Sequence, residues 1–185
     1  MIELSIAGRP CRLFGSETPD CILVQPSARH ENASLEAEVT QLTGLIDRPF
    51  LLVTIELEDW TIDLMPWPDG NISRDPEAGK HGQETLDYIL QDLLPELERR
   101  YGPRPVILGG YSLGGLFALW ASCRTDRFQA IARVGDNLRA YYGMLQDQMG
   151  PEHCALVWEE GGHFNENAGR LARAFAWCLG RMPRM

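Results

Sequence analysis

The stretch from Val106 to Trp120 constrains the fold of this chain more than any other part of the sequence. Three apolar residues, Val106 to Leu108, lead into two glycines, and the residues from Gly110 to Gly114 then match the pattern Gly-x-Ser-x-Gly. The apolar residues that follow are typical of a buried helix. The stretch therefore predicts a strand, a sharp turn and a helix, with Ser112 held at the turn.

The turn at Ser112 needs the glycines that flank it, at positions 110 and 114, for a physical reason. Because glycine has no Cβ, strand and helix can approach closely and the serine can adopt a strained backbone conformation. Its hydroxyl is then exposed above the sheet, and the backbone N–H of Leu113 points to where an oxyanion would form. The alternative is a glycine-rich turn whose serine only caps a helix, but a cap does not need glycine on both sides.

The composition is typical of a globular protein with one domain, which we expect to span residues 1–185. The formal net charge of −9 argues against a nucleic-acid partner, since no basic face could dominate such a surface. The sequence shows neither the pattern of a signal peptide nor an apolar run of the roughly 20 residues that a membrane span requires. We therefore expect a cytoplasmic protein without a membrane partner.

The cysteines do not form a metal-binding pattern. They stand at positions 11, 21, 123, 154 and 178. Their number is odd and their spacing is irregular. We interpret them as reduced, mostly buried thiols. No cluster of ligand residues suggests a cofactor, so we expect neither a metal nor an organic cofactor.

The hydrophobic pattern predicts strands that alternate with helices. Alternating residues at 2–6 and 11–14 predict an antiparallel hairpin that turns at Gly8-Arg9-Pro10. Further predicted elements are a buried strand at 21–24 ended by Pro26, a helix at 33–46, a strand at 50–55, a helix at 83–101 kinked or divided at Pro95, a strand at 128–134, a helix at 136–149 and a strand at 154–158. This succession indicates an α/β fold with a mostly parallel sheet, the hairpin at one edge and helices on both faces.

The segment from 56 to 81 is unusually long for a loop and carries no clear period. It follows a central strand, on the side where open α/β sheets bind ligands, and such a loop commonly supplies a second oxyanion donor. We expect that donor near Asp59 or Trp60, and we count Tyr111 and Trp67 with the substrate and oxyanion region. The alternative is that both tryptophans only pack the loop down.

A serine hydroxyl is a weak nucleophile and needs a neighbouring base. His163 follows the predicted strand at 154–158 and a tight loop, and it stands directly before the last helix. His30 and His153 lie in polar surface segments, and His81 lies at the end of the long loop. We predict His163 as the base, with His81 next in order. The alternative is that His163 only bonds the loop backbone.

These motifs resemble those of the α/β-hydrolase superfamily, in particular the small bacterial serine esterases of the esterase D and enterochelin esterase-like branch. The resemblance rests on the residues from Gly110 to Ala118, on Gly161-Gly162-His163-Phe164 and on the aromatic segments 59–60 and 64–67. It implies hydrolysis of a small-molecule carboxylic ester, with Ser112 as nucleophile and His163 as base. In this fold a catalytic acid lies between these two residues in the chain.

That acid is the weakest part of the pattern. The family usually carries two strands and the acid-bearing loop between the segments that correspond here to 101–131 and 134–163. The chain looks as if roughly 40 residues, about one βαβ unit with a loop, had been left out near Ala132. Asp136 is the natural substitute, although it is also a good N-cap for the helix that follows. Glu159 and Glu160 are interpreted as solvated loop charges, and Asp126 is a weaker candidate.

Two other functions use the same residues. An acyltransferase would need the same nucleophile, base and oxyanion donors as an esterase. A catalytically weak or inactive hydrolase-like protein that binds a small ligand would follow from loss of the acid.

Overall fold

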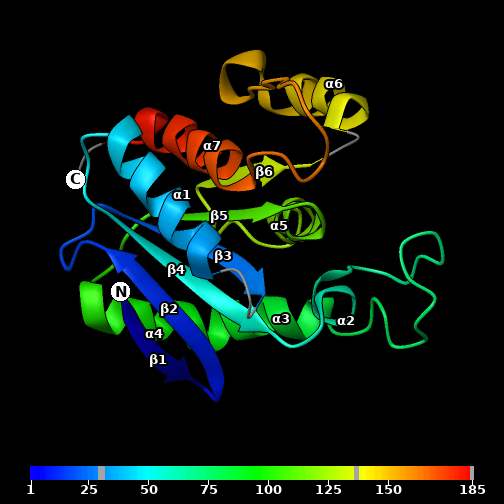
Figure 1. Ribbon diagram of the computed structural model, residues 1–185, viewed down its shortest axis with the longest axis horizontal. Coiled ribbons are helices and arrows are strands. Elements are labelled where there is room, and N and C mark those ends of the chain that lie inside the picture. The colour runs from blue at the N-terminus through cyan, green and yellow to red at the C-terminus, as the bar shows by residue number, and fades with distance from the viewer. Residues whose placement is uncertain (29–31, 136–137, 184–185) are drawn as a thin grey trace.

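Six strands form one sheet through the centre of the molecule (Figure 1). The computed structural model describes residues 1–28, 32–135 and 138–183. The strands are β1 (Ile2–Ile6), β2 (Arg9–Gly15), β3 (Cys21–Ala28), β4 (Phe50–Leu57), β5 (Val106–Tyr111) and β6 (Ala130–Val134). They lie in the order β1-β2-β4-β3-β5-β6, antiparallel from β1 to β4 and parallel across the rest. The predicted mostly parallel sheet with an antiparallel hairpin at one edge is confirmed.

Helices cover both faces of this sheet, as predicted (Figure 1). They are α1 (Asn32–Leu45), α2 (Trp60–Leu64), α3 (Gly82–Tyr88), α4 (Leu94–Tyr101), α5 (Leu113–Ser122), α6 (Leu138–Met149) and α7 (Asn167–Arg181), with a π-helical turn at Ile89–Leu93 and a 3-10 turn at Pro151–His153. One face is covered by α1 and α7, which pack against each other, and the other by α3, α4 and α5. Within the described ranges, no helix has the length and apolarity needed to cross a membrane.

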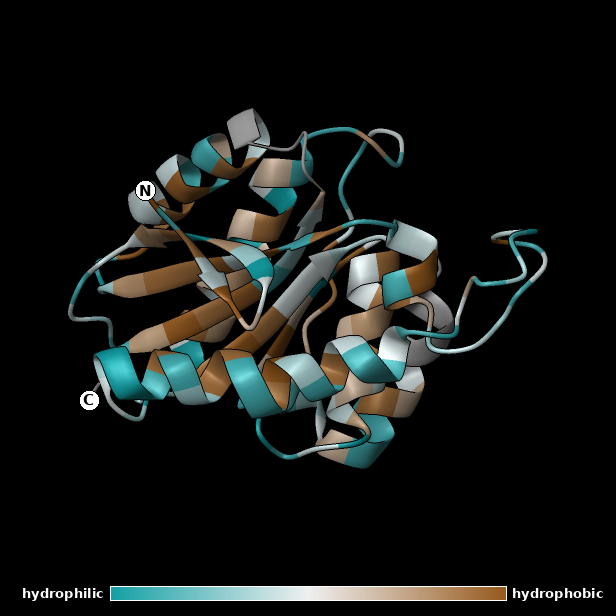
Figure 2. Ribbon diagram, turned by 90° about the horizontal axis from the view of Figure 1, so that it is seen from below, coloured by the Kyte–Doolittle hydropathy of each residue, from teal (hydrophilic) through white to brown (hydrophobic). Residues whose placement is uncertain are grey.

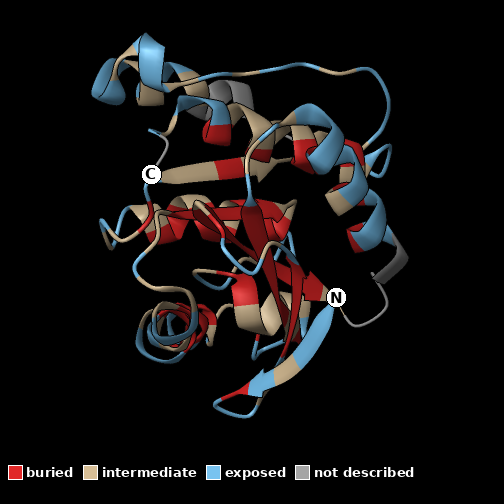
Figure 3. Ribbon diagram, turned by 90° about the vertical axis from the view of Figure 1, so that its left-hand side faces the viewer, coloured by how far each residue is buried: buried red, intermediate tan, exposed pale blue. Residues whose placement is uncertain are grey.

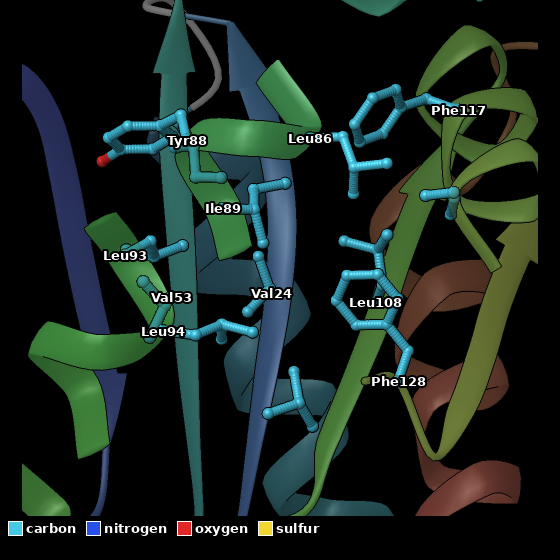
Figure 4. Packing of buried hydrophobic residues seen from close by; sticks show 14 of the residues in the cluster. Val24, Val53, Leu86, Tyr88, Ile89, Leu93, Leu94, Leu108, Phe117 and Phe128 are labelled. Atoms are coloured by element: carbon cyan, nitrogen blue, oxygen red, sulfur yellow. The ribbon is translucent and has the colours of Figure 1, made fainter. Parts of the chain in front are cut away.

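The core has two layers because the central strands are buried on both faces. Leu23 and Ile107 pack under α1 and α7, whereas the next residues along their strands, Val24 and Leu108, pack on the opposite side. Figure 4 shows Val24 and Leu108 near Leu86 of α3. All five side chains are at most 1% exposed. Burial on both faces explains the continuous apolar runs, and Figure 2 shows these apolar residues concentrated along the strands.

The N-terminal hairpin turns one residue earlier than predicted. Ala7 and Gly8 form the turn, with φ angles of 46° and 86°, and β2 already begins at Arg9. Positive φ at both positions is typical of the two-residue turn whose twist matches that of the flanking strands. The sequence prediction placed the turn at Gly8-Arg9-Pro10, but Arg9 and Pro10 lie within the ladder, opposite Ile6 and Ser5.

Pro26 does not end its strand, contrary to the prediction. β3 continues to Ala28, paired throughout with β4. Its pairing with β5 stops at Val24, so Pro26 lies where only one neighbouring strand is hydrogen-bonded. A proline is tolerated at such a position because its missing N–H can face the unpaired side.

The predicted helix at 83–101 is divided immediately before Pro95. The π-helical turn at Ile89–Leu93 joins α3 to α4, and the Leu94 N–H donates to the Ile89 carbonyl, five residues back. Pro95 has no N–H with which to continue the α-helical pattern. The wider turn nevertheless keeps the apolar side on the sheet, since Ile89 and Leu93 are both 0% exposed.

The predicted strand at 154–158 is wrong. Residues 154–159 have no regular structure, and β6 is the last strand among the described residues. Val157 and Trp158 are 72% and 64% exposed, although a buried strand would have covered them. An apolar run forms a strand only where a neighbouring strand can pair with it. Among the described residues, the sheet ends at β6 and no strand is available beside it.

The long segment after β4 begins with the short helix α2 and then projects from the body as an arm (Figures 1 and 2). The arm is closed at its base, where the N–H groups of Gly79 and His81 donate to the carbonyls of Thr61 and Ile62, both at 3.2 Å. Gly79 has a φ of 78°, and a Cβ there would lie 2.4 Å from the backbone carbonyl carbon of Trp67. This close approach requires glycine and holds the two ends of the arm together.

Candidate active site

Ser112 stands between β5 and α5 in a strained conformation, with φ 53° and ψ −116°. This region of backbone space costs a residue with a side chain about 1–3 kcal/mol and persists only where the surroundings enforce it. Gly110 shows how they do so, because a Cβ there would lie 2.3 Å from the carbonyl carbon of Gly114. Strand and helix therefore approach more closely than any side chain would permit. The Ser112 N–H also donates to the Val134 carbonyl at 2.7 Å, which ties the turn to β6.

His163 lies beside this serine. Its Nε2 is 2.9 Å from Ser112 Oγ, although the two residues are 51 positions apart in the chain. His163 belongs to a turn that precedes α7, and it is half-buried. A histidine at this distance can accept the hydroxyl proton when its Nε2 is unprotonated.

Two aromatic rings flank the imidazole. The Tyr111 ring lies 5.0 Å from that of His163 between centroids, and the Phe164 ring lies 4.9 Å away in an edge-on arrangement. Tyr111, which we grouped with the substrate and oxyanion region, therefore contacts the predicted base. Phe164 is 81% exposed, so one wall beside His163 is an open apolar surface.

The expected oxyanion region lies where α2 meets α5. Leu113 is the first residue of α5, and the Trp60 ring packs on the same helical turn, where a Cβ at Gly114 would lie 3.4 Å from Trp60 Cζ2. Asp59 caps α2 by accepting the N–H groups of Ile62 and Thr61, and these bonds lower the pKa of its carboxyl.

Trp67 lies away from this contact, at the start of the arm. Its side chain is 49% exposed, while its backbone packs on Gly79. The two tryptophans therefore differ: Trp60 holds α2 on the turn that carries Ser112, and Trp67 faces solvent at the base of the arm.

The predicted acid, Asp136, lies outside the described residues.

Glu159 is not a solvated charge, because both of its carboxylate oxygens are bound by Arg173 at 2.6 Å. The hydrogen bonds from Arg173 hold its pKa below the ordinary value. Glu160 is exposed, as interpreted. Asp126 is exposed before β6, at the opposite end of the parallel strands from Ser112.

Sequence reasoning missed two arginines of α7 that contact the segment before His163. Arg170 and Arg173 both bind Glu159, and Arg170 also binds the carbonyls of Glu160 and Gly162. A spacing of three residues places both side chains on one face of a helix. Two arginines three residues apart, close in the sequence to the acidic residues 159 and 160, were the signal that could have indicated this contact.

The cysteines and the other ligand-type residues do not form a metal site in the part of the chain that the structure describes. All five thiols are free. Burial raises the pKa of Cys21 and of Cys178 to about 12, so both are protonated and unreactive at neutral pH.

Several solved structures that are similar to this one are named as hydrolases or hydrolase homologues. Siderophore hydrolase EstB from Aspergillus nidulans aligns with a TM-score of 0.51 and 19% identity, over 94% of this chain and 76% of that one. Enterobactin and salmochelin hydrolase IroE aligns with a TM-score of 0.63 and 12% identity, over 94% and 90%. An α/β serine hydrolase homologue from Coxiella burnetii aligns with a TM-score of 0.52 and 10% identity, over 98% and 96%.

The sequence itself matches no protein-family model and no curated protein. The likeness is therefore one of architecture, and it shows that the chain has the α/β-hydrolase fold.

Proposed function

We propose that this α/β-hydrolase-fold protein is a serine hydrolase that cleaves carboxylic esters, with Ser112 as nucleophile and His163 as base. The observation that carries the proposal is the 2.9 Å contact between Ser112 Oγ and His163 Nε2, made by a serine with a φ of 53°. A serine that served only as a cap would have no need of this strain or of a histidine partner. The similar structures named as siderophore and enterobactin hydrolases support the same class of reaction.

In the proposed acylation step, Ser112 Oγ attacks the ester carbonyl carbon while His163 Nε2 takes the hydroxyl proton. The resulting oxyanion accepts a hydrogen bond from the Leu113 N–H and from a second backbone donor near Trp60. His163 then returns the proton to the leaving alcohol as the carbon–oxygen bond breaks, which leaves an acyl group on Ser112. A water molecule then attacks the acyl carbon while His163 takes its proton, and His163 passes that proton to Ser112 Oγ as the carboxylic acid leaves.

The position of the elbow also favours this chemistry electrostatically. Ser112 precedes the first residue of α5, a helix of 10 residues whose first backbone N–H groups point toward the reacting atoms. Negative charge that develops on the carbonyl oxygen is stabilised at this end of a helix. Removing a single oxyanion donor costs about 10²–10³-fold in turnover in enzymes of this kind.

The test is covalent labelling with a fluorophosphonate probe, followed by assays with short-chain p-nitrophenyl esters. Wild-type protein should be labelled on Ser112, and Ser112→Ala should abolish both labelling and hydrolysis. Ser122→Ala is the matched control, since Ser122 ends the same helix and its hydroxyl donates to the Leu119 carbonyl at 2.7 Å. Native wild-type protein that stays unlabelled, beside an active serine esterase that is labelled, would overturn the proposal.

The second candidate is a weak or inactive hydrolase-like protein that binds a small ligand. It is favoured by the end of the sheet at β6, where the described residues contain no later strand. The same labelling experiment separates the two, because an inactive binding protein would not react with the probe. Transfer of the acyl group to an added alcohol, measured as new ester, would identify an acyltransferase.

A further inference from the structure

The segment that leads to His163 is not held by strand pairing. Residues 154–159 have no regular structure, and the turn that contains His163 follows at 163–166. A base must nevertheless stay within about 3 Å of its nucleophile to take its proton. The position of this base therefore depends on contacts other than a sheet ladder.

Arg170 of α7 makes such contacts with one guanidinium group. Its Nε donates to Glu159 Oε2 at 3.2 Å, its Nη2 to the Glu160 carbonyl at 2.8 Å and its Nη1 to the Gly162 carbonyl at 3.2 Å. The last of these acceptors belongs to the residue directly before His163. The Arg170 side chain is only 14% exposed, and its bond to Glu159 is partly buried, whereas its bonds to the two carbonyls lie at the surface.

Arg173, one turn further along α7, also binds Glu159. Its Nε and Nη2 both donate to the carboxylate at 2.6 Å, a bidentate pair. This geometry needs the planar fork of arginine, which lysine lacks. Glu159 is 25% exposed at its side chain, so the pair is partly shielded from solvent.

The helix that carries both arginines is in turn fixed to β5, the strand that leads to Ser112. Phe175 of α7 is 0% exposed, and a Cβ at Gly109 of β5 would lie 2.2 Å from its Cζ atom. Gly109 stands three residues before Ser112. A continuous series of packed contacts thus runs from the nucleophile through β5 and α7 to Arg170, and from there to the backbone beside His163.

We infer that Arg170 is a positioning residue for the base: it binds the carbonyls of residues 160 and 162 to α7, and this keeps His163 Nε2 beside Ser112 Oγ. Arg173 assists by fixing Glu159, to which Arg170 is also bound. The catalytic part of the inference rests on the proposed hydrolase function. The structural part, that Arg170 holds the segment 159–163 on α7, does not depend on that function.

The experiment combines hydrogen–deuterium exchange with ester kinetics on Arg170→Met. Exchange should rise at 159–166 and stay unchanged at 106–122, the peptide that spans β5 and α5. The kcat for the ester should fall about 10²-fold while KM changes less than twofold, because a base displaced by about 1 Å loses turnover without altering ground-state binding. If Arg170 only stabilised the fold, its replacement would raise hydrogen exchange at 159–166 and at 106–122 together.

Arg181→Met is the matched control, since Arg181 lies on the same helix but stacks on the Trp177 ring at 3.8 Å. Neither exchange at 159–166 nor kcat should change. Glu159→Gln provides a second perturbation if Arg170→Met does not fold, and it should produce the same pattern to a smaller degree.

Each outcome decides a separate point. Unchanged exchange at 159–166 in a folded Arg170→Met protein overturns the inference, whatever the activity. Raised exchange with unchanged kcat shows that Arg170 holds the segment but does not position the base, which also overturns it. A wild-type protein that neither reacts with the probe nor hydrolyses esters refutes the proposed function, and the exchange measurement alone then decides whether Arg170 holds the segment.

Discussion

Ser112 and His163 meet at 2.9 Å, but the molecule holds them in place by different physical means. Around Ser112 the contacts are between backbones, such as the approach of Gly110 to Gly114, and the adjoining core side chains are fully buried. Around His163 they are polar bonds from α7 to a segment without regular structure. Figure 3 shows the contrast, with buried residues along β5 and exposed ones over α6 and the segment after it.

The difference teaches that His163 can be held beside Ser112 without a strand that leads to it. Close packing is insensitive to pH and salt, because it depends on shape alone. Ion pairs respond to both, through protonation and screening. Perturbations of shape should therefore act on the Ser112 region, and perturbations of charge on the His163 region.

The largest expected effect tests whether the two regions act as one unit. His163→Ala should lower kcat for ester hydrolysis by about 10³-fold or more, because Ser112 would lose its base. The double variant Ser112→Ala, His163→Ala should be no worse than either single variant, since residues of one catalytic unit are not additive. Steady-state kinetics measures both, with circular dichroism as the check on folding.

His81→Ala is the control, and it should keep most of the activity. His81 stands at the N-cap position of α3, without a capping hydrogen bond from its side chain, and was the second candidate for the base. Activity that survives in His163→Ala and is lost in His81→Ala would reverse the assignment.

The second effect separates the two regions by stability. Gly110→Ala should destabilise the protein by about 3 kcal/mol, the upper end for overpacking, because the new methyl would meet the backbone of Gly114. In α7, the helix whose arginines bind the His163 segment, the opposite holds: Gly180 has nothing within 4 Å of a Cβ, so Gly180→Ala should stabilise by about 0.5–1 kcal/mol. Denaturant unfolding measures both. Equal effects at the two glycines would remove the proposed distinction.

Sequence reasoning succeeded where local pattern and fold agree. The Gly-x-Ser-x-Gly stretch predicted a strand, a strained turn and a helix, and the structure has β5, a φ of 53° at Ser112, and α5. The spacing of glycines carries this information because the close approach of strand and helix is a local property. The fold class and the hairpin at one edge follow from patterns of the same kind.

Prediction failed where the outcome depends on distant partners. The apolar run 154–158 suits a strand, but whether it pairs depends on a neighbouring strand, and the described residues provide none beyond β6. Glu159 resembled an ordinary loop charge, since nothing in its immediate sequence indicates that Arg170 and Arg173, on the next helix, bind it. The three-residue spacing of Arg170 and Arg173 indicates that both lie on one helix face, but it does not say which carboxylate they bind, so the contact with Glu159 became visible only in the structure.

The third prediction concerns Asp136, which lies outside the described residues and so remains a candidate from sequence alone. If Asp136 were the catalytic acid, Asp136→Asn would lower kcat by about 10⁴-fold, because the histidine would take the wrong tautomer. If it only caps the following helix, the change costs almost nothing, since Asn caps about as well as Asp. We expect the second result, a loss below tenfold in kcat. A loss above a thousandfold in a normally folded variant would show that the His163 region contains a complete triad.

The smallest effect is a titration that should be confined to the His163 region. Arg173 holds the pKa of Glu159 below its ordinary value of about 4.5, so the carboxylate is favoured in the folded protein. The stabilisation is therefore fully present above pH 4.5 and is lost as the pH falls through the lowered pKa. The Arg173 Nε–H resonance, whose donor binds Glu159 Oε1, should stay constant from neutral pH to 4.5 and shift only below it. In Glu159→Gln this shift should disappear, while the Leu108 amide in β5 should not move in either protein. An Arg173 shift that persists in Glu159→Gln would show that another group controls this contact, and the assignment of ionic contacts to the His163 region would then be wrong.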